Sequence, residues 1–179
     1  MNLPNRLTVV RIALIPVMVI LLSFQSAPYS QIGGAVFFIA ALTDYFDGHI
    51  ARKRHLITDF GRFLDPLADK LLVLSALILL TASHQVPAWL TVLILARELS
   101  IDGLRMIAVN NGTVISAGKL GKIKTASQMV YILFLLFLDM TAYSNWFTIV
   151  LTVWIALITV ASGADYFRQY GKELVKEGI

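Results

Sequence analysis

The sequence predicts an all-α integral membrane protein with six transmembrane helices and both ends of the chain in the cytoplasm. Of its 179 residues, 58% are hydrophobic and 15% are charged, whereas a soluble domain averages about 45–50% apolar and about 25% charged residues. The mean hydropathy is +0.76. The apolar residues also gather into six stretches, and a helix needs roughly 20 residues to cross the hydrocarbon core of a bilayer. Residues 1–179 are therefore expected to form one membrane domain with short loops.

Short polar or small-residue segments separate the six expected spans. The spans are placed at residues 7–24, 32–47, 64–82, 87–108, 125–141 and 146–167. A short interfacial segment is expected at residues 2–8, ahead of the first span. Arg6 precedes the first span and Arg11 lies in its first turns, as in a signal peptide, but residues 24–27 form a weak cleavage region. We therefore expect the first span to remain as a helix.

The basic residues predict the orientation. They lie near the chain ends and near the second-to-third and fourth-to-fifth links, with Arg97 deeper in the fourth span. The full set is Arg6, Arg11, Arg52, Lys53, Arg54, Arg62, Lys70, Arg97, Arg105, Lys119, Lys122, Lys124, Arg168, Lys172 and Lys176. Because cytoplasmic loops are rich in Lys and Arg, both termini are expected in the cytoplasm. Tyr166, Phe167 and Tyr170 would form an aromatic belt at the cytoplasmic interface.

The composition also excludes several kinds of chemistry. The chain has no cysteine, which excludes disulfides, thiolate metal sites and cysteine nucleophiles. Its three histidines show no spacing typical of a zinc site. The net charge is +4. Most of the basic residues that produce it lie at the expected membrane boundaries, so nucleic acid is not expected as a partner.

Four aspartates lie at the expected cytoplasmic ends of spans two and three. Asp44 and Asp47 are three residues apart, and Asp65 and Asp69 are four residues apart. Either spacing places both side chains of a pair on one helix face. Two antiparallel helices joined by a short basic link would bring the four carboxylates to one depth. The pattern predicts an acidic site at the membrane–cytoplasm interface.

Clustered carboxylates repel one another, so cations are expected to neutralise them. Carboxylate oxygens favour hard ions such as Mg²⁺, Mn²⁺ or Ca²⁺, and two ions about 4 Å apart would suit an in-line displacement at phosphorus. Gly48, Ala51 and Gly61 leave room for a substrate on the same face, and Arg52 would place a positive charge beside a phosphate. The alternative is that the aspartates cap helices and pair with arginines. Four of them in register favour a site.

These residues fill every fixed position of the pattern D-x2-D-G-x2-A-R-x8-G-x3-D-x3-D. They are Asp44, Asp47, Gly48, Ala51, Arg52, Gly61, Asp65 and Asp69. By this motif, its length and its six-helix layout, the chain resembles the CDP-alcohol phosphatidyltransferases. The resemblance implies transfer of a phosphatidyl group from CDP-diacylglycerol to an alcohol, with release of CMP. It also implies a homodimer in the bacterial cytoplasmic membrane, with the active site facing the cytoplasm.

The resemblance further implies a role for each motif residue. Two divalent cations, Mg²⁺ or Mn²⁺, would be held by Asp44, Asp47, Asp65 and Asp69. Asp69 would also be the general base that takes the proton of the acceptor hydroxyl. The residues in contact with CDP-diacylglycerol would be Asp44, Gly48, Ala51, Arg52 and Gly61.

A second group of basic residues indicates which kind of alcohol accepts the phosphatidyl group. Arg97 and Arg105 lie in the fourth span, and Lys122 and Lys124 lead into the fifth. A phosphate accepts paired hydrogen bonds from Arg, so these four residues are expected to bind an acceptor phosphate. The alternatives are membrane anchoring for Lys122 and its neighbour Lys119, and for Arg97 pairing with Glu98, Asp102 or a carboxylate of the acidic site.

Three short segments resemble one branch of the family, the phosphatidylglycerophosphate synthases. They are Pro4-Asn5-x-Leu7-Thr8-x2-Arg11, Ala96-Arg97-Glu98 and Gly121-Lys122-x-Lys124-Thr125. This resemblance implies sn-glycerol 3-phosphate as the acceptor and phosphatidylglycerophosphate as the product. Asn5 and Thr8 are then candidate substrate contacts, with helix capping as the alternative.

Other readings remain open at this point. The acceptor could be phosphatidylglycerol, inositol phosphate, inositol or serine, although a neutral acceptor would leave the basic group without a charge partner. The carboxylates could belong to a divalent-cation transporter, but transport needs polar residues at successive depths, and here they lie on one side. A catalytically silent scaffold is the third reading, and the complete motif favours activity over it.

Overall fold

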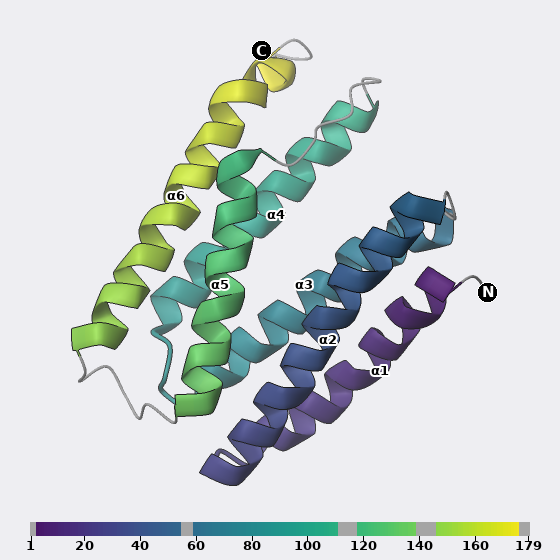
Figure 1. Cartoon of the computed structure of the whole chain (residues 1–179). Helices are drawn as coiled ribbons and strands as arrows, with labels where there is room; N and C mark the ends of the chain where they lie inside the picture. The colour runs from purple at the N-terminus through teal and green to yellow at the C-terminus, as the bar shows by residue number, and fades with distance from the viewer. Residues whose placement is uncertain (1–2, 55–58, 111–117, 139–145, 176–179) are drawn as a thin grey trace. The chain divides into compact units, whose positions relative to one another are not determined.

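The computed structural model describes residues 3–54, 59–110, 118–138 and 146–175 (Figure 1). Within these ranges it describes the side chains except those of residues 3, 4, 44–54, 59, 60, 62, 63, 110 and 172–175. The described residues form six helices: α1 (Leu3–Ser23), α2 (Ala27–Arg54), α3 (Asp59–Ala82), α4 (Ala88–Asn110), α5 (Lys119–Leu138) and α6 (Trp146–Val175). The expected all-helical architecture is confirmed for this part of the chain.

Two of the links between helices turn through a residue with a positive φ. Gln25 (φ 49°) follows α1 and His84 (φ 58°) follows α3. At the end of α3, the amide of Gln85 donates to the carbonyl of Leu80 (2.8 Å) and that of His84 to Thr81 (3.0 Å). These are the two hydrogen bonds of a Schellman motif, which satisfies the last carbonyls of a helix. α1 and α3 therefore end at or within one residue of the predicted ends of their spans.

The described chain divides into two compact units. Unit 1 comprises residues 1–85 and 132–141, so it contains α1, α2, α3 and the last residues of α5. In this unit α1 packs against both α2 and α3 (Figure 1). Thr8 of α1 bonds to Asp65 near the start of α3, so the beginnings of these two helices lie together.

A glycine permits the contact between α1 and α2. A Cβ atom on Gly33 would lie 2.6 Å from Cδ2 of Leu22, closer than two carbon atoms approach without a shift. Leu22 is buried, as are Met18 on α1 and Phe37 on α2. The core of unit 1 therefore depends on the missing side chain at position 33.

Unit 2 comprises residues 86–131 and 142–179, with α4, most of α5, and α6. Here α4 packs along α6. Arg105, late in α4, bonds to Tyr166, late in α6, so the two helices run in the same direction. Tyr131 of α5 bonds to Thr152 of α6 (2.9 Å).

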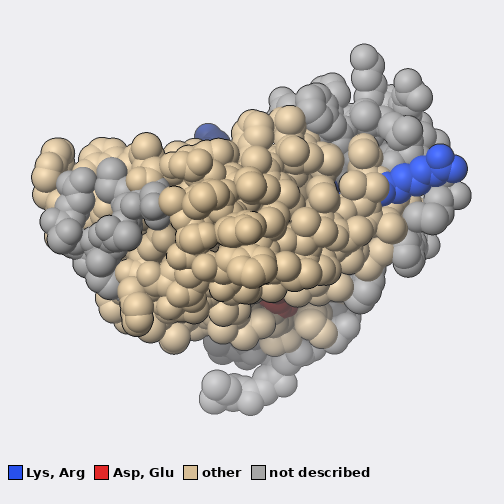
Figure 2. Space-filling view, turned by 90° about the horizontal axis from the view of Figure 1, so that it is seen from below, with Lys and Arg blue, Asp and Glu red and all other residues tan. Residues whose placement is uncertain are grey.

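Three of the described helices are long and apolar enough to cross a membrane. They are α1 over Asn5–Ser23, α5 over Lys119–Leu138 and α6 over Trp146–Gly171. Large apolar side chains such as Ile20 and Leu157 are more than half exposed, and most of the described residues visible in Figure 2 are neither Lys, Arg, Asp nor Glu. Exposed apolar surface of this extent suits lipid rather than water. The chain is a membrane-embedded helical protein.

The other helices do not meet this criterion over the residues that the structure describes. In α2 the part with described side chains, Ala27–Thr43, is 17 residues long, and Asp44 follows it. Charged residues stand inside α3 and α4, among them Asp65 and Arg97. The residues expected to carry the chemistry therefore lower the hydropathy of the helices that bear them.

The helices also extend beyond the predicted spans. α1 begins at Leu3 and continues without a break, so the segment at residues 2–8 that we expected to be separate is part of this helix as far as it is described. Burial explains the continuity, because Asn5 and Thr8 pack inside unit 1. At 28 residues, α2 is about 42 Å long, which exceeds the roughly 30 Å of hydrocarbon.

Candidate functional site

The described half of the predicted acidic site lies on α3. Asp65 and Asp69 are one helical turn apart, and both are half-buried. The Thr8 hydroxyl of α1 donates a hydrogen bond to Oδ1 of Asp65 over 2.5 Å. Gly61, one turn before Asp65, is buried. The first turns of α1 therefore fix the orientation of the Asp65 carboxylate.

A polar face of α1 is turned into unit 1. Asn5, Thr8 and Arg11 are spaced three residues apart and all are buried, with Arg11 at 0% exposure. Burying a charged side chain costs free energy unless it is paired, so this position is not a simple surface anchor. From the sequence, Arg11 is expected as one of the basic residues and as the last position of the segment at residues 4–11, without a role in the site. Its spacing from Thr8 is the signal that could have identified it.

The other half of the predicted acidic site lies on the last part of α2. Asp44 and Asp47, with Gly48, Ala51 and Arg52, belong to this helix, but their side chains lie outside the described residues. Asp44 stands ten residues before the end of α2 and Asp69 ten residues after the start of α3. Each is thus about 15 Å along its helix from the link, and α2 contacts α3.

The donor atoms of this site suit a hard metal ion. Asp65 and Asp69 offer carboxylate oxygens, the ligand type that Mg²⁺ and Mn²⁺ prefer. No group of three metal-binding side chains occurs among the described residues, since the aspartates of α2 lie outside them. The chemistry of the described donors fits the expected ion, and the four-carboxylate set stays a prediction.

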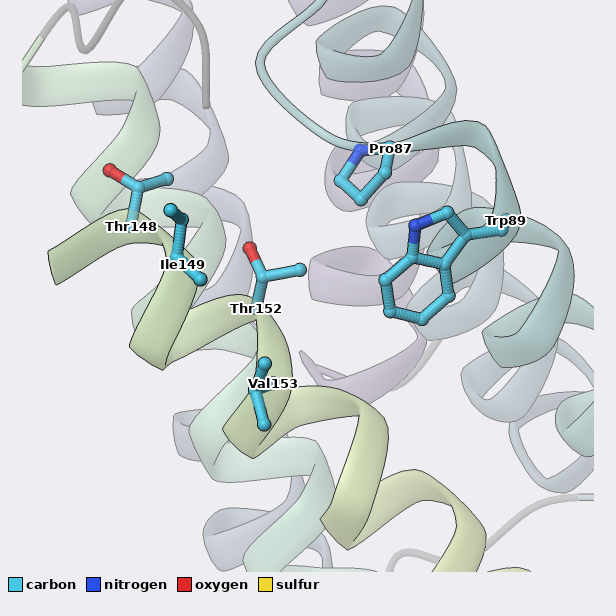
Figure 3. Close-up of a pocket in the computed structure, with 6 residues that line it drawn as sticks. All are labelled: Pro87, Trp89, Thr148, Ile149, Thr152 and Val153. Atoms are coloured by element: carbon cyan, nitrogen blue, oxygen red, sulfur yellow. The ribbon is translucent and has the colours of Figure 1, made fainter. Parts of the chain in front are cut away.

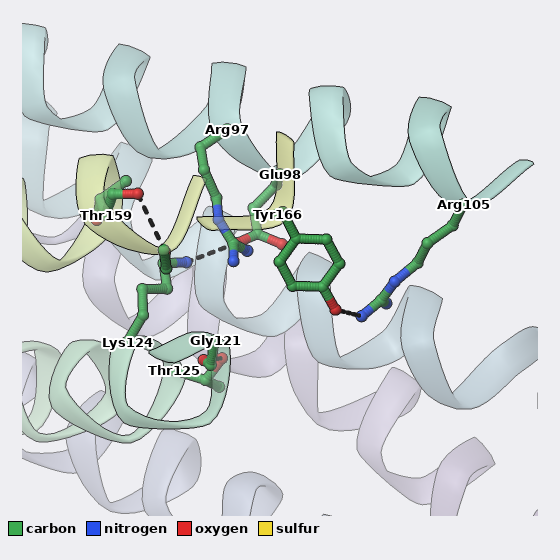
Figure 4. A network of polar contacts seen from close by, with 9 residues as sticks. Arg97, Glu98, Arg105, Gly121, Lys124, Thr125, Thr159 and Tyr166 are labelled. Carbon is green, nitrogen blue, oxygen red and sulfur yellow. Dashed lines mark hydrogen bonds and ion pairs between the residues drawn. The ribbon is translucent and has the colours of Figure 1, made fainter. Parts of the chain in front are cut away.

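A cluster of polar contacts lies in unit 2 (Figure 4). Lys124 Nζ of α5 donates to Oε1 of Glu98 over 2.5 Å, and Nη1 of Arg97 donates to the same oxygen over 2.9 Å. Lys124 is buried, with 3% exposure. Two cations share one carboxylate, so these three side chains carry a net charge of +1. We call these residues, with Arg105 and Tyr166, the basic cluster.

Tyr166 joins the two arginines of the basic cluster. Nη2 of Arg105 donates to the Tyr166 hydroxyl over 2.7 Å, and Tyr166 is 2% exposed. The guanidinium carbons of Arg97 and Arg105 lie 5.8 and 5.5 Å from the centre of its ring, within the range of cation–π attraction. Gly121 of α5 adjoins both partners, since a Cβ there would lie 3.6 Å from Arg97 Nη2 and 3.7 Å from Tyr166.

The structure brings together three of the four residues predicted to bind an acceptor phosphate. Arg97, Arg105 and Lys124 gather around Glu98 and Tyr166, and the pairing of Arg97 with Glu98 considered as an alternative does occur. Lys122 is exposed on α5. It lies two positions from Lys124, a spacing at which helical side chains do not share a face.

Tyr166 is the residue that sequence reasoning missed. It was assigned to an interfacial aromatic belt, but it packs with Ile101, Leu104 and Ala108 in a buried group. Phe167, in contrast, is exposed, as expected of a belt residue. An aromatic residue inside a predicted belt gives no sequence signal of a partner 61 residues away.

A separate pocket in unit 2 has different chemistry (Figure 3). It encloses about 280 Å³ between the start of α4 and the start of α6. The lining residues are Pro87, Trp89, Thr148, Ile149, Thr152 and Val153. None of these six side chains carries a charge, so they do not suit a phosphate.

Comparison with known proteins identifies the family. The profile of the CDP-alcohol phosphatidyltransferase family matches residues 1–154. A CDP-diacylglycerol–glycerol-3-phosphate 3-phosphatidyltransferase of Bacillus subtilis is 42% identical over 94% of both chains. One from Rickettsia typhi is 38% identical over 93% of this chain and 96% of its own.

A third relative carries a related name. A probable phosphatidylglycerophosphate synthase of Mycobacterium tuberculosis is 40% identical over 92% of this chain and 79% of its own length. The profile match and these identities extend well beyond the Asp44–Asp69 motif. The chain belongs to the CDP-alcohol phosphatidyltransferase family.

Proposed function

We propose that this protein transfers the phosphatidyl group of CDP-diacylglycerol to sn-glycerol 3-phosphate, yielding phosphatidylglycerophosphate and CMP. Family membership supports the donor and the reaction type, and relatives named for this reaction support the acceptor. The observation in the structure that carries the acceptor is the basic cluster, where Arg97, Arg105 and Lys124 converge.

In the proposed reaction the acceptor hydroxyl oxygen attacks the phosphorus of the phosphatidyl group. The bond from that phosphorus to the CMP oxygen breaks, and its electron pair leaves with CMP. Asp69 takes the proton of the acceptor hydroxyl. Thr8 holds one oxygen of Asp65 by its hydrogen bond, so the carboxylate is already oriented before a substrate binds, which lowers the cost of assembling the site.

The acidic site would hold two divalent cations, Mg²⁺ or Mn²⁺, through Asp44, Asp47, Asp65 and Asp69. Such ions neutralise pyrophosphate charge and stabilise the departing CMP. Gly48, Ala51, Arg52 and Gly61 would border the nucleotide together with Asp44. Support for these roles comes from the complete motif and from the oxygen-only donors on α3.

The basic cluster would bind the phosphate of the acceptor. At neutral pH a phosphate monoester carries about 1.5 to 2 negative charges, and arginine binds its oxygens in pairs. Arg97, Arg105 and Lys124 are the proposed ligands, and exposed Lys122 would contribute at longer range. Asn5 stays a candidate substrate contact, whereas the hydrogen bond of Thr8 to Asp65 supports a role in orienting that carboxylate.

For the membrane, we propose six spans, with the termini and the active site facing the cytoplasm of a bacterial cell. The helices α2, α3 and α4, of 28, 24 and 23 residues, would reach about 42, 36 and 34 Å. Each exceeds the hydrocarbon thickness of roughly 30 Å. The distribution of Lys and Arg supports the orientation. We further propose a homodimer, on the strength of the family resemblance.

Release of CMP from CDP-diacylglycerol by purified protein in detergent tests this function. We expect release that requires both a divalent cation and glycerol 3-phosphate. CMP release that does not depend on glycerol 3-phosphate but increases with inositol phosphate or phosphatidylglycerol would show that the acceptor is that other alcohol. Metal flux into vesicles loaded with the protein, without any release of CMP, would instead favour the transporter reading.

A further inference from the structure

Two arginine donors in the basic cluster point to a ligand. The Nε atoms of Arg97 and Arg105 are buried and have no hydrogen-bond acceptor among the residues that the structure describes. A buried donor of a charged group that lacks an acceptor loses the hydrogen bond it would make with water, so it destabilises the structure unless a ligand accepts it. Both guanidinium groups lie beside the ring of Tyr166.

Tyr166 determines where these guanidinium groups can lie. Its hydroxyl accepts a hydrogen bond from Nη2 of Arg105, which holds that guanidinium group beside the phenol oxygen. Its ring packs with Ile101 and Leu104, so it is fixed to the interior of unit 2. Arg97 is held from two sides, by the Tyr166 ring and by Glu98.

The helix packing leaves Arg97 little freedom to move away. A Cβ on Gly163 would lie 3.4 Å from Cγ of Arg97, and one on Gly121 would lie 3.6 Å from its Nη2. α6 and α5 therefore contact the Arg97 side chain at points where they carry no side chain of their own. Arg97 and Arg105 are held relative to one rigid aromatic ring.

We infer that Tyr166 is a positioning residue that holds Arg97 and Arg105, two proposed ligands of the acceptor phosphate, in place for a phosphate monoester. The inference rests on the proposed function and deepens it, because it names the feature that selects a phosphorylated acceptor. The hydroxyl oxygen of Tyr166 is the critical atom, since it accepts the hydrogen bond from Arg105. A phenylalanine would keep the ring, its packing and the cation–π contacts but would remove the hydrogen bond to Arg105.

The test compares Tyr166→Phe with Tyr170→Phe. Tyr170 packs against the same buried group and its ring lies 5.7 Å from that of Tyr166, so it is a matched control. In the Tyr166 variant we expect the KM for glycerol 3-phosphate to rise roughly tenfold, as for loss of a hydrogen bond to a charged group. The kcat and the KM for CDP-diacylglycerol should change less than twofold, and the control should behave like the wild type.

Inorganic phosphate gives a second readout that needs no turnover of the acceptor. As a competitor of glycerol 3-phosphate, it should inhibit the Tyr166→Phe variant with a Ki that is higher by the same factor. A merely structural role would instead lower kcat and thermal stability and leave the ratio of the two KM values unchanged. That result, or an unchanged KM and Ki, would overturn the inference.

A double-mutant cycle with Arg105→Lys completes the experiment. Lysine keeps the charge but lacks the forked donors of arginine, so Tyr166→Phe should have little further effect in that background. Full additivity of the two changes would contradict positioning through Arg105. If Tyr166→Phe does not fold, Arg105→Lys alone should reproduce the selective rise in KM, and an unselective loss of activity would overturn the inference.

The failure of the inference can be told apart from failure of the proposed function. A wild-type protein that does not respond to glycerol 3-phosphate refutes the proposed function, and the inference with it. A wild type that responds, with a Tyr166→Phe variant that matches it, refutes the inference alone.

Discussion

Individual hydrogen bonds in this protein connect residues that the sequence separates widely. Thr8 and Asp65 are 57 residues apart, yet their side chains are 2.5 Å apart. The motif predicted Asp65 from its neighbours in the chain, but it gave no information about Thr8. Local spacing identifies the members of one helix face, whereas a contact between helices depends on how the helices pack.

The contact between Thr8 and Asp65 predicts an effect on metal binding. Thr8→Val keeps the shape of the side chain and removes the donor, so the Asp65 carboxylate should lose its fixed orientation. We expect the affinity for Mn²⁺ to fall by roughly tenfold, the lower end for loss of an outer-shell hydrogen bond. Titration of the purified protein with Mn²⁺, monitored by electron paramagnetic resonance, measures this affinity. Thr8→Ser keeps the hydroxyl and should bind normally; equal losses in both variants would contradict this role.

The basic cluster predicts different roles for two lysines on α5. Lys124 is buried against Glu98 and Lys122 is exposed. Lys124→Met should raise the KM for glycerol 3-phosphate by roughly tenfold or more, because a cation at the proposed phosphate site and one of the two partners of Glu98 are both lost. Lys122→Met should change it less than about threefold, as a screened surface charge does. Steady-state kinetics with each substrate varied in turn distinguish the two, and similar effects would refute the assignment.

At the scale of the helices, apolar runs predicted the number and order of elements but not their ends. The links after α1 and α3 fall where predicted, because the apolar run and the helix stop together at a residue with positive φ. α6 instead continues past Phe167 to Val175. Beyond the hydrocarbon, a helix no longer needs apolar residues, so hydropathy loses its value as a guide to its end.

The packing of α1 on α2 gives a prediction about stability. Gly33→Ala places a Cβ 2.6 Å from Leu22 in the core of unit 1, and overpacking of this kind costs about 1–3 kcal/mol. We expect a lower midpoint of thermal unfolding in detergent. Gly103→Ala on α4 is the matched control, since nothing lies within 4 Å of its Cβ. In mid-helix that change should be neutral or stabilising by up to about 1 kcal/mol, and the opposite order of midpoints would contradict the packing argument.

At the scale of the whole molecule, composition predicted a membrane protein and the structure supports that class. Large exposed apolar side chains lie on α1 and α6, among them Ile20 and Leu157, and family membership follows from the length of the match. The motif on α2 and α3 predicted the reaction class. The shared role of Glu98 and the burial of Tyr166 required the structure, because both come from contacts between α4, α5 and α6.

The length of the apolar part of α2 has a consequence for the lipid that surrounds the protein. From its start at Ala27 to its first charged residue, Asp44, α2 has 17 uncharged residues, Ala27–Thr43, which reach about 26 Å, somewhat less than the hydrocarbon thickness of roughly 30 Å. Asp44 follows directly, so a thicker bilayer would draw this aspartate toward the acyl chains unless the lipid thins around it.

In nanodiscs, turnover should therefore fall as the acyl chains lengthen, at an unchanged KM for glycerol 3-phosphate. Equal turnover in short-chain and long-chain lipids would contradict this. An enzyme with this dependence would make its phospholipid fastest where the membrane is thin, and so adjust synthesis to the local thickness of the membrane it helps to build.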